Sequence, residues 1–306
     1  MAKATTGKAV GLEIDYGTIR AVEASGTPAN PKIAGIASIR LPEGSVEEGI
    51  IVKPHEVGLA LRELWGQGKV KNRRVLLGIS NQSVLVRYTT IPKVPKEKMA
   101  NVVRFQAQEL LPVPIEQVVL DFMVIGETIA DENPALEILL VAARRDMLRG
   151  FLEALSAAKL EPADIDVSTL ALMRVLPIAA NDRTVAVINV AEGLTNILVS
   201  DKGRPRLARL VAVRLNDLAV KLDVPLANLF ITTGNLNKEQ RQIYDELVDT
   251  LINKVSSSLG YYQNLSGATS LEAVILNGKG ALLPGIYKRL EDALGLSVKV
   301  INPFDR

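Results

Sequence analysis

The sequence predicts an α/β fold of two lobes, on three observations. The chain has 306 residues, enough for about two domains of ordinary size. Strand-like and helix-like segments alternate along much of the chain, which is typical of α/β architecture. A β meander at the start returns near residue 185, so that both halves of the chain open with the same pattern.

The first half begins with three strand-like runs separated by turn-forming residues. A helix follows, because Pro54 suits a first turn and the apolar residues after it fall at helical spacing. Prolines then bracket an amphipathic helix at 96–111. The expected strands are 10–14, 18–24, 32–41, 74–79, 83–91, 118–125, 136–143 and 164–167, and the expected helices are 54–65, 96–111 and 145–160.

The second half repeats the opening meander. Placing Glu13 on Asn189 also places Gly17 on Gly193, which indicates an internal duplication. A long apolar stripe predicts a helix over 238–265, and a strand, a glycine-containing turn and a helix follow between 273 and 294. The other expected elements are strands 185–190, 194–200, 206–213 and 297–300 and helices 216–222 and 226–231.

The composition excludes several classes of protein. Lys and Arg number 36 and Asp and Glu 34, and no basic stripe with interleaved aromatics stands out, so nucleic acid is a poor candidate partner. The chain has no Cys and one His, His55, which disfavours multi-His metal sites and Ser-His-Asp hydrolases. No stretch is long enough to span a membrane and no signal peptide opens the chain. We therefore expect a soluble cytoplasmic protein that reaches a membrane only through partners.

Two lobes with duplicated meanders and a late strand-glycine-helix unit resemble the actin-like ATPase superfamily. The matching segments are 11–14 with 18–23, 187–190 and 275–280. Within that superfamily, the segment RFQAQELLPVPIEQVVLDF at 104–122 is similar to the hallmark of the PilM family of type IV pilus assembly. Segments 163–172, 282–285 and 302–304 carry the same resemblance.

The resemblance implies a two-lobed actin-like, ribonuclease H-like fold with a small α+β sub-domain inserted in the first lobe. Lobe I would comprise 8–82 and 169–184, the inserted sub-domain 83–168, and lobe II 185–306 with a reduced second part. The related division protein FtsA carries a C-terminal amphipathic membrane helix, and a related type II secretion component continues into a transmembrane helix. This sequence shows neither, which favours the pilus interpretation.

The superfamily binds ATP and Mg²⁺ in turns that correspond to identifiable residues here. Two registers are possible in the first turn, with either Glu13 or Asp15 as the carboxylate. In the register that uses Glu13, Asp15 stands where the superfamily has Gly. In the second turn, Asn189 stands in place of Asp and Ala191 in place of Gly. We therefore expect weak or degenerate nucleotide binding and no turnover. The alternative for these turns is a polar hairpin or a simple connecting loop. The candidate residues are Glu13, Asp15, Gly17, Thr18, Arg20, Asn189, Gly193, Thr195, Gly278 and Gly280.

In the PilM family, the N-terminal cytoplasmic tail of the membrane protein PilN docks between the inserted sub-domain and lobe I. The helix at 96–111 has apolar residues on more than one side, so part of it could receive a peptide. The alternative is that all of them pack on the sub-domain's own sheet. The candidates are Met99, Val102, Val103, Phe105 and Gln106. We expect a non-enzymatic scaffold whose further partners include other platform proteins and motor ATPases; an active actin-like ATPase is the alternative.

Overall fold

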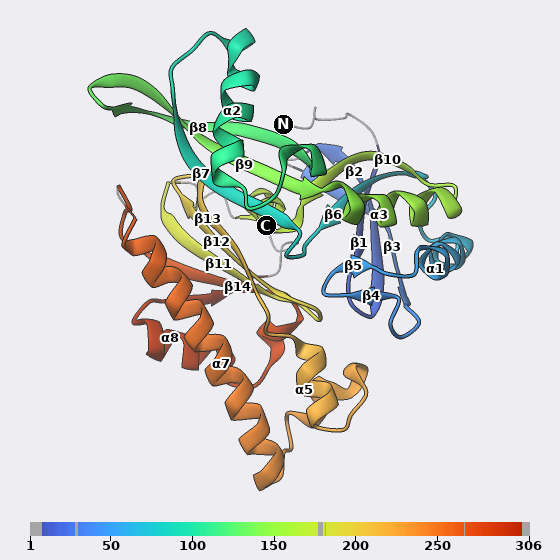
Figure 1. The fold of residues 1–306 in the computed structure, drawn as a ribbon. Helices are drawn as coiled ribbons and strands as arrows, with labels where there is room; N and C mark the ends of the chain where they lie inside the picture. Colours follow the sequence, from blue (N-terminus) through green and yellow to red (C-terminus); the bar gives the residue numbers. More distant parts are fainter. Residues whose placement is uncertain (1–7, 28–29, 177–179, 181, 266, 302–306) are drawn as a thin grey trace. The chain divides into compact units, whose positions relative to one another are not determined.

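The computed structural model describes residues 8–27, 30–176, 180, 182–265 and 267–301. Contacts divide the chain into two compact units, Met1–Val167 and Ser168–Arg306. Each unit is built on a five-stranded sheet, and the first carries a smaller three-stranded sheet in addition (Figure 1). Segment 302–304, which contributed to the family resemblance, lies outside the described residues.

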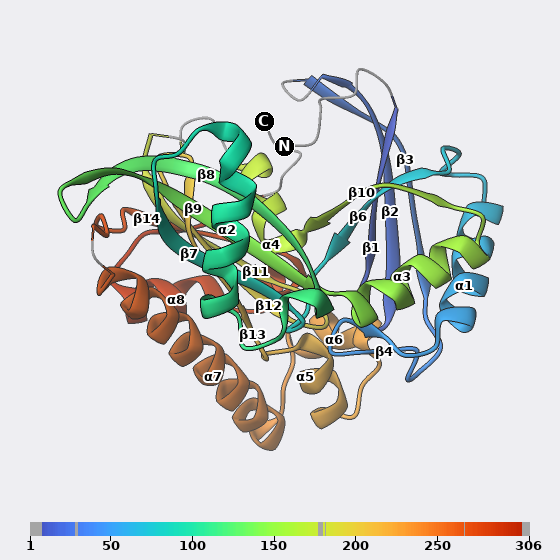
Figure 2. The same ribbon diagram turned by 45° about the horizontal axis from the view of Figure 1, so that its top comes forward.

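The main sheet of the first unit has the order β10-β6-β1-β2-β3. Alternating residues such as Val10, Leu12 and Leu77 are buried, as expected of a sheet with one face against a core. The helices α1 (Pro54–Gly66) and α3 (Arg145–Ala157) pack against each other and lie on the same side of the sheet (Figure 2). The strands of this sheet are β1 (Ala9–Ile14), β2 (Thr18–Thr27), β3 (Asn30–Arg40), β6 (Arg74–Ile79) and β10 (Glu161–Val167). Two short strands, β4 (Val46–Glu47) and β5 (Ile50–Ile51), pair with each other in a separate two-stranded sheet.

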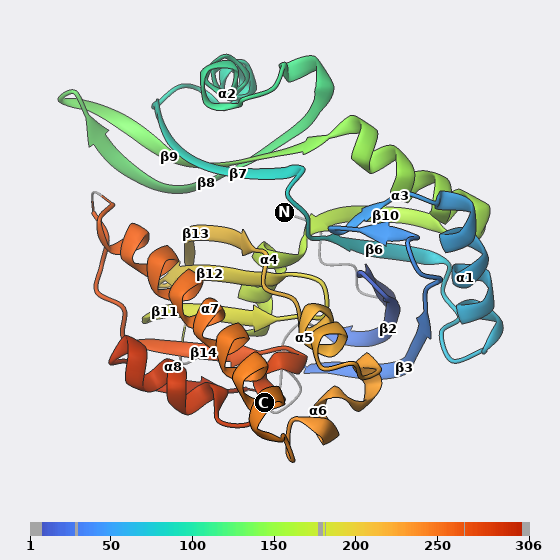
Figure 3. The ribbon, with the colours of Figure 1, turned by 60° about the horizontal axis from the view of Figure 1, so that its bottom comes forward.

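The inserted sub-domain is an antiparallel sheet of order β7-β9-β8 with one helix, α2 (Lys96–Leu110), against it (Figure 3). Its strands are β7 (Val84–Pro92), β8 (Val118–Ala130) and β9 (Asn133–Arg144), with a short helix η1 (Ile115–Gln117) before β8.

This sub-domain is smaller than the expected range of 83–168. After β9 the chain returns to the main sheet, because α3 packs on α1 and β10 pairs in parallel with β6. Phe151 and Leu155 of α3 are fully buried. The separate sheet therefore ends at Arg144, and the helix and strand after it belong to the main body of the first unit.

The second unit repeats the topology of the first. Its sheet order, β13-β12-β11-β14-β15, matches β3-β2-β1-β6-β10 strand for strand. Glu13 pairs with Arg20 across β1 and β2, and Asn189 pairs with Asn196 across β11 and β12, so the two hairpins have the same register. The duplication expected from the sequence is confirmed. The strands are β11 (Thr184–Val190), β12 (Thr195–Asp201), β13 (Arg204–Val211), β14 (Ala273–Asn277) and β15 (Val298–Val300).

Both faces of the second sheet are covered. One apolar core forms under α5 (Leu215–Lys221), α6 (Leu229–Thr232), the long α7 (Lys238–Gln263) and α8 (Ile286–Leu294). A second core on the other face includes Leu170, Leu176 and Leu198. The segment after Val167, with α4 (Ser168–Ala171) and η2 (Leu172–Val175), therefore packs with the second unit, whereas the sequence interpretation placed 169–184 in lobe I.

Tyr244 of α7 lies in the core of the second unit, where its hydroxyl donates a 2.6 Å hydrogen bond to the Pro284 carbonyl. Burial raises the pKa of Tyr244 from its ordinary value to about 12, although Arg289 and Arg241 oppose the shift. The neutral phenol therefore stabilises the folded state below pH ~10, and this contribution is lost as the pH rises from ~10 towards 12.

We expect an alkaline absorbance titration of the folded protein to include a late tyrosine step near pH 12, which we assign to Tyr244. The Tyr244→Phe variant should lack this late step and lose about 1 kcal/mol of unfolding free energy with the hydrogen bond. A late step that survives in the variant would assign it to another tyrosine.

Candidate functional site

The first predicted turn joins β1 to β2, and the structure brings its five candidate residues together. The Asp15 amide donates a 3.0 Å hydrogen bond to the Thr18 carbonyl, which closes the turn around Gly17. The Arg20 guanidinium on β2 reaches back to both carboxylates, at 2.9 Å from Glu13 and 3.7 Å from Asp15. The Arg20 guanidinium thus occupies the position between the Glu13 and Asp15 carboxylates where a hydrated cation would bind.

The second candidate group lies within the second unit, where two turns sit next to each other. Asn189, the last residue but one of β11, pairs in parallel with Asn277 at the end of β14. Gly193 is buried in the β11–β12 turn, and the Thr195 hydroxyl donates a 2.9 Å hydrogen bond to the Val213 carbonyl. Gly278 and Gly280 follow β14 in the adjacent turn, so the structure groups all five candidates of the second half.

Gly278 and Gly280 are required by the packing of the protein itself. Gly278 has φ +80, and a Cβ there would lie 2.5 Å from the Asn189 Oδ1 atom. A Cβ at Gly280 would lie 2.2 Å from a methyl carbon of Val190. The glycine spacing that suggested a nucleotide turn therefore has a sufficient structural cause in the close approach of the two turns.

Three further residues, Glu192, Asn277 and Lys279, lie at these turns, and their surroundings were not expected from the sequence. Glu192, only 2% exposed, forms an ion pair with Lys279, which lies between the two glycines. The Asn277 side chain is 4% exposed, and neither amide atom has a hydrogen-bond partner among the described residues. Glu192 and Lys279 are 87 residues apart in the chain, and no local sequence pattern indicates that their side chains are in contact.

The two duplicated hairpins differ in charge at equivalent positions. The first has the ion pair of Glu13 and Arg20, whereas the second has the amides Asn189 and Asn196. The Asn196 Oδ1 atom accepts a 2.5 Å hydrogen bond from the Thr169 hydroxyl, which ties α4 to β12. The second hairpin thus has no carboxylate at the position equivalent to Glu13.

The five partner-binding candidates on α2 separate into different environments. Val103 is 3% exposed and belongs to the core of the sub-domain, so its assignment to a partner surface does not agree with the structure. Met99 and Val102 are half-buried against the same core. The Gln106 amide lies 3.5 Å from a Glu109 carboxylate oxygen. Phe105 is 66% exposed on the opposite side of the helix.

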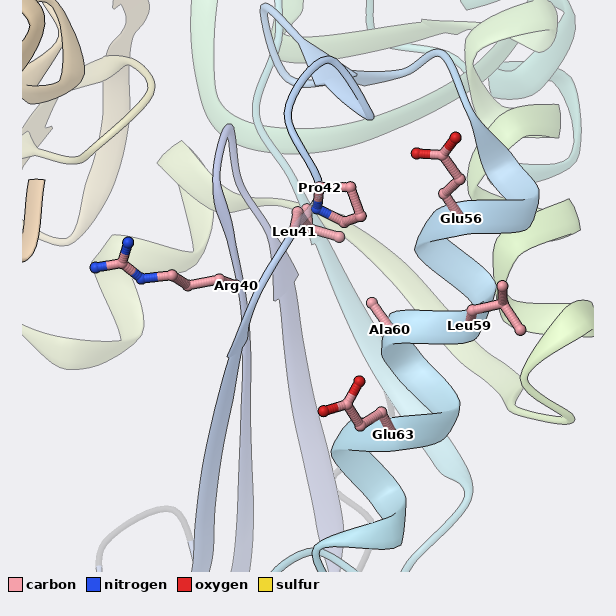
Figure 4. A pocket seen from close by; sticks show the side chains of 7 residues that line it. All are labelled: Arg40, Leu41, Pro42, Glu56, Leu59, Ala60 and Glu63. Atoms are coloured by element: carbon pink, nitrogen blue, oxygen red, sulfur yellow. The ribbon is translucent and has the colours of Figure 1, made fainter. Parts of the chain in front are cut away.

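A cavity of about 300 Å³ lies beside α1 in the first unit (Figure 4). Glu56 and Glu63 project from α1 on the side facing the segment that follows β3, and Ala60 lies between them. The Ser45 hydroxyl donates a 3.1 Å hydrogen bond to Glu56. None of the residues predicted from the sequence lines this cavity. Its lining residues are Arg40, Leu41, Pro42, Glu56, Leu59, Ala60 and Glu63.

Within the described residues, no cluster of three or more His, Asp or Glu side chains could hold a metal ion. Within the same ranges, every helix is too short or too polar to cross a bilayer.

Comparison with solved structures assigns the fold. A structure of a PilM–PilN type IV pilus biogenesis complex matches 98% of this chain and 90% of that chain, with 28% identity and a TM-score of 0.83. The ethanolamine utilization protein EutJ from Carboxydothermus hydrogenoformans matches 97% of this chain and 86% of its own, with 15% identity and a TM-score of 0.56. MreB 5 of Spiroplasma citri bound to AMPPNP matches 97% and 92%, with 11% identity and a TM-score of 0.56. The fold is therefore the two-lobed actin-like fold.

Comparison with protein families identifies the family of the chain as well as its fold. Residues 11–306 match the family described as type IV pilus assembly protein PilM. The match covers both duplicated sheets and the inserted sub-domain, including the segment 104–122 on which the sequence resemblance rested. The chain therefore belongs to the PilM family of type IV pilus assembly proteins.

Proposed function

We propose that this protein is a cytoplasmic scaffold of the type IV pilus inner-membrane platform and that it binds the N-terminal tail of PilN. Two findings support the proposal: membership of the PilM family, and 28% identity to a protein solved in a complex with PilN. Other platform proteins and the motor ATPases are further candidate partners of such a scaffold.

The observation that carries the proposal is the apolar flank of α2. Val102 and Phe105 are three residues apart and therefore neighbours on one side of the helix. Val103 and Ala107 hold the other side in the sub-domain core. Phe105 is a large exposed aromatic on a helix that is already anchored, and such residues are typical binding anchors for peptides. The flank formed by Val102 and Phe105 is thus the surface we assign to the PilN tail.

We expect the Phe105→Ser variant to bind a synthetic peptide of the PilN N-terminal tail at least about tenfold more weakly than the unaltered protein, because it loses the exposed anchor. Titration calorimetry would measure the affinity. The matched control is Tyr261→Ser, which removes an aromatic that is 56% exposed in the second unit and should leave the affinity unchanged.

Two results would contradict the assignment. If the unaltered protein does not bind the tail at high micromolar peptide, the proposed partner is wrong. If Phe105→Ser and Tyr261→Ser both bind as tightly as the unaltered protein, the tail binds elsewhere. Because Phe105 is outside the core, its replacement should leave the fold intact, which circular dichroism would check.

We further propose that nucleotide binding in this chain is degenerate and that it does not turn over ATP. Arg20 already neutralises the carboxylates of the first turn, and Lys279 is engaged by Glu192 in the second unit. Asn189 cannot supply the negative charge that favours hydrated Mg²⁺. These residues therefore do not fit Mg-ATP, and a scaffold does not require it.

A further inference from the structure

Six basic residues meet at one edge of the main sheet in the first unit. Because β1, β6 and β10 run in parallel, their amino ends lie on the same edge. The Asn72 side chain donates a 2.9 Å hydrogen bond to the Lys8 carbonyl, and the Glu161 amide donates one of the same length to the Arg73 carbonyl. These two hydrogen bonds connect the three segments that precede β1, β6 and β10, so their basic residues form one surface. We call it the basic edge: Lys8, Lys69, Lys71, Arg73, Arg74 and Lys159.

The backbone that carries the centre of the basic edge is held firmly. Glu23, buried beneath it, accepts hydrogen bonds from the amides of Lys71 at 2.7 Å and Asn72 at 3.5 Å. The Val70 side chain is buried, and the Trp65 indole donates a 3.0 Å hydrogen bond to the Asn72 carbonyl. The segment 69–73 is therefore a fixed platform rather than a loose loop, and its long side chains point outward.

Arginines and lysines have different roles on this edge. Arg73 donates to the carbonyls of Ala158 and Lys159 at the end of α3, and Arg74 lies 3.8 Å from Glu161. The ammonium groups of three exposed lysines have no hydrogen-bond or ion-pair partner in the described part of the chain; these are Lys69, Lys71 and Lys159. The arginines thus fasten the structure, while these three lysines leave their charge to the solvent. The fourth lysine of the edge, Lys8, lies 3.9 Å from the Glu23 carboxylate.

We propose that the basic edge docks directly on an anionic phospholipid bilayer, in addition to the membrane contact through partners that the sequence led us to expect. It contains six basic residues against two acidic ones, Glu23 and Glu161, although the whole chain has a net charge of only +2. Four or more clustered basic residues are typical of surfaces that bind anionic lipid. Separated lysines on flexible stems suit a plane of mobile headgroups, whereas a single phosphate or carboxylate is usually held by converging arginine forks.

This docking is independent of the PilN tail, because the basic edge belongs to the main sheet whereas Val102 and Phe105 belong to α2. Flotation with vesicles of phosphatidylglycerol and phosphatidylcholine in equal parts would test it. The protein should float with these vesicles and remain behind with pure phosphatidylcholine. Added salt should release it, since the attraction acts between exposed charges.

The decisive variant is Lys69→Gln/Lys71→Gln/Lys159→Gln, which should lower the fraction bound at least roughly tenfold. The matched control, Lys238→Gln/Lys254→Gln/Lys299→Gln, removes the same charge from exposed positions of the second unit and should bind as the unaltered protein does.

Three results would overturn the proposal. They are failure of the unaltered protein to float with anionic vesicles, equal loss of binding in both triple variants, and binding to polyglutamate but not to vesicles. The last result would indicate an acidic protein partner instead. Circular dichroism and the fluorescence of Trp65 would verify that both variants remain folded.

Discussion

Replacing Gly35 with alanine should lower the unfolding free energy of the first unit by about 3 kcal/mol. Gly35 lies in β3 opposite Glu23, and a Cβ there would lie 1.8 Å from the Lys69 carbonyl oxygen. That oxygen belongs to backbone, so no side-chain rotation can relieve the contact. The segment 69–73 would have to move, which would stretch the hydrogen bonds that Glu23 accepts from Lys71 and Asn72.

The chain provides its own probe of this region. Trp65 is the only tryptophan, and its indole donates to the Asn72 carbonyl in the segment that would be displaced. Urea unfolding followed by Trp65 fluorescence should show a lower midpoint in the Gly35→Ala variant with an unchanged slope.

The control is Gly11→Ala in the neighbouring β1, where a Cβ would meet no atom within 4 Å. Its midpoint should stay close to that of the unaltered protein. If both variants unfold at the same midpoint, the contact between Gly35 and Lys69 is not a constraint.

Much of the fold could be predicted because its signals are local. Alternating burial in β1 and β2 and helical spacing in α7 are properties of short windows, and the structure confirms them. The duplication was also visible, since Glu13 and Asn189 each lie one residue before the end of a strand and are followed by turns of equal length. What local pattern could not predict is which sheet an element joins. The helix expected at 145–160 exists as α3, which ends at Ala157, but only its packing on α1 places it outside the sub-domain.

The candidate site shows the same division. Its turns could be located because Gly and Asp mark turns in any sequence. Their contacts could not, because Glu192 and Lys279 are far apart in the chain, and only the parallel pairing of β11 with β14 brings them together. On α2, part of the helix was expected to be available to a partner, with packing of all its apolar residues on the small sheet as the alternative. The structure assigns Val103 to the core and leaves Phe105 exposed, a distinction that depends on which face the small sheet covers.

Mg-ATP should leave the thermal stability of this protein unchanged. A ligand present at one hundred times its Kd stabilises a folded protein by about 2.7 kcal/mol, which raises the unfolding midpoint of a domain of this size by several degrees. In the first unit, Mg²⁺ would have to separate Arg20 from Glu13 and Asp15. In the second unit, the equivalent hairpin has no carboxylate at Asn189. Because the first turn is occupied and a carboxylate is missing at Asn189, we expect too little affinity for Mg-ATP to stabilise the folded protein.

The measurement is the unfolding midpoint with and without about 1 mM Mg-ATP, a concentration that would reveal any Kd of roughly 10 µM or tighter, together with phosphate release over time. We expect no shift and no release. The Arg20→Gln variant separates exclusion of Mg²⁺ by Arg20 from loss of the carboxylate at position 189. It removes the guanidinium from both carboxylates of the first turn while leaving Asn189 and the pair of Glu192 and Lys279 in place. If Mg-ATP stabilises this variant alone, Arg20 is what excludes the metal. If it stabilises the unaltered protein and phosphate is released, the chain is an active ATPase and the proposed degeneration is wrong.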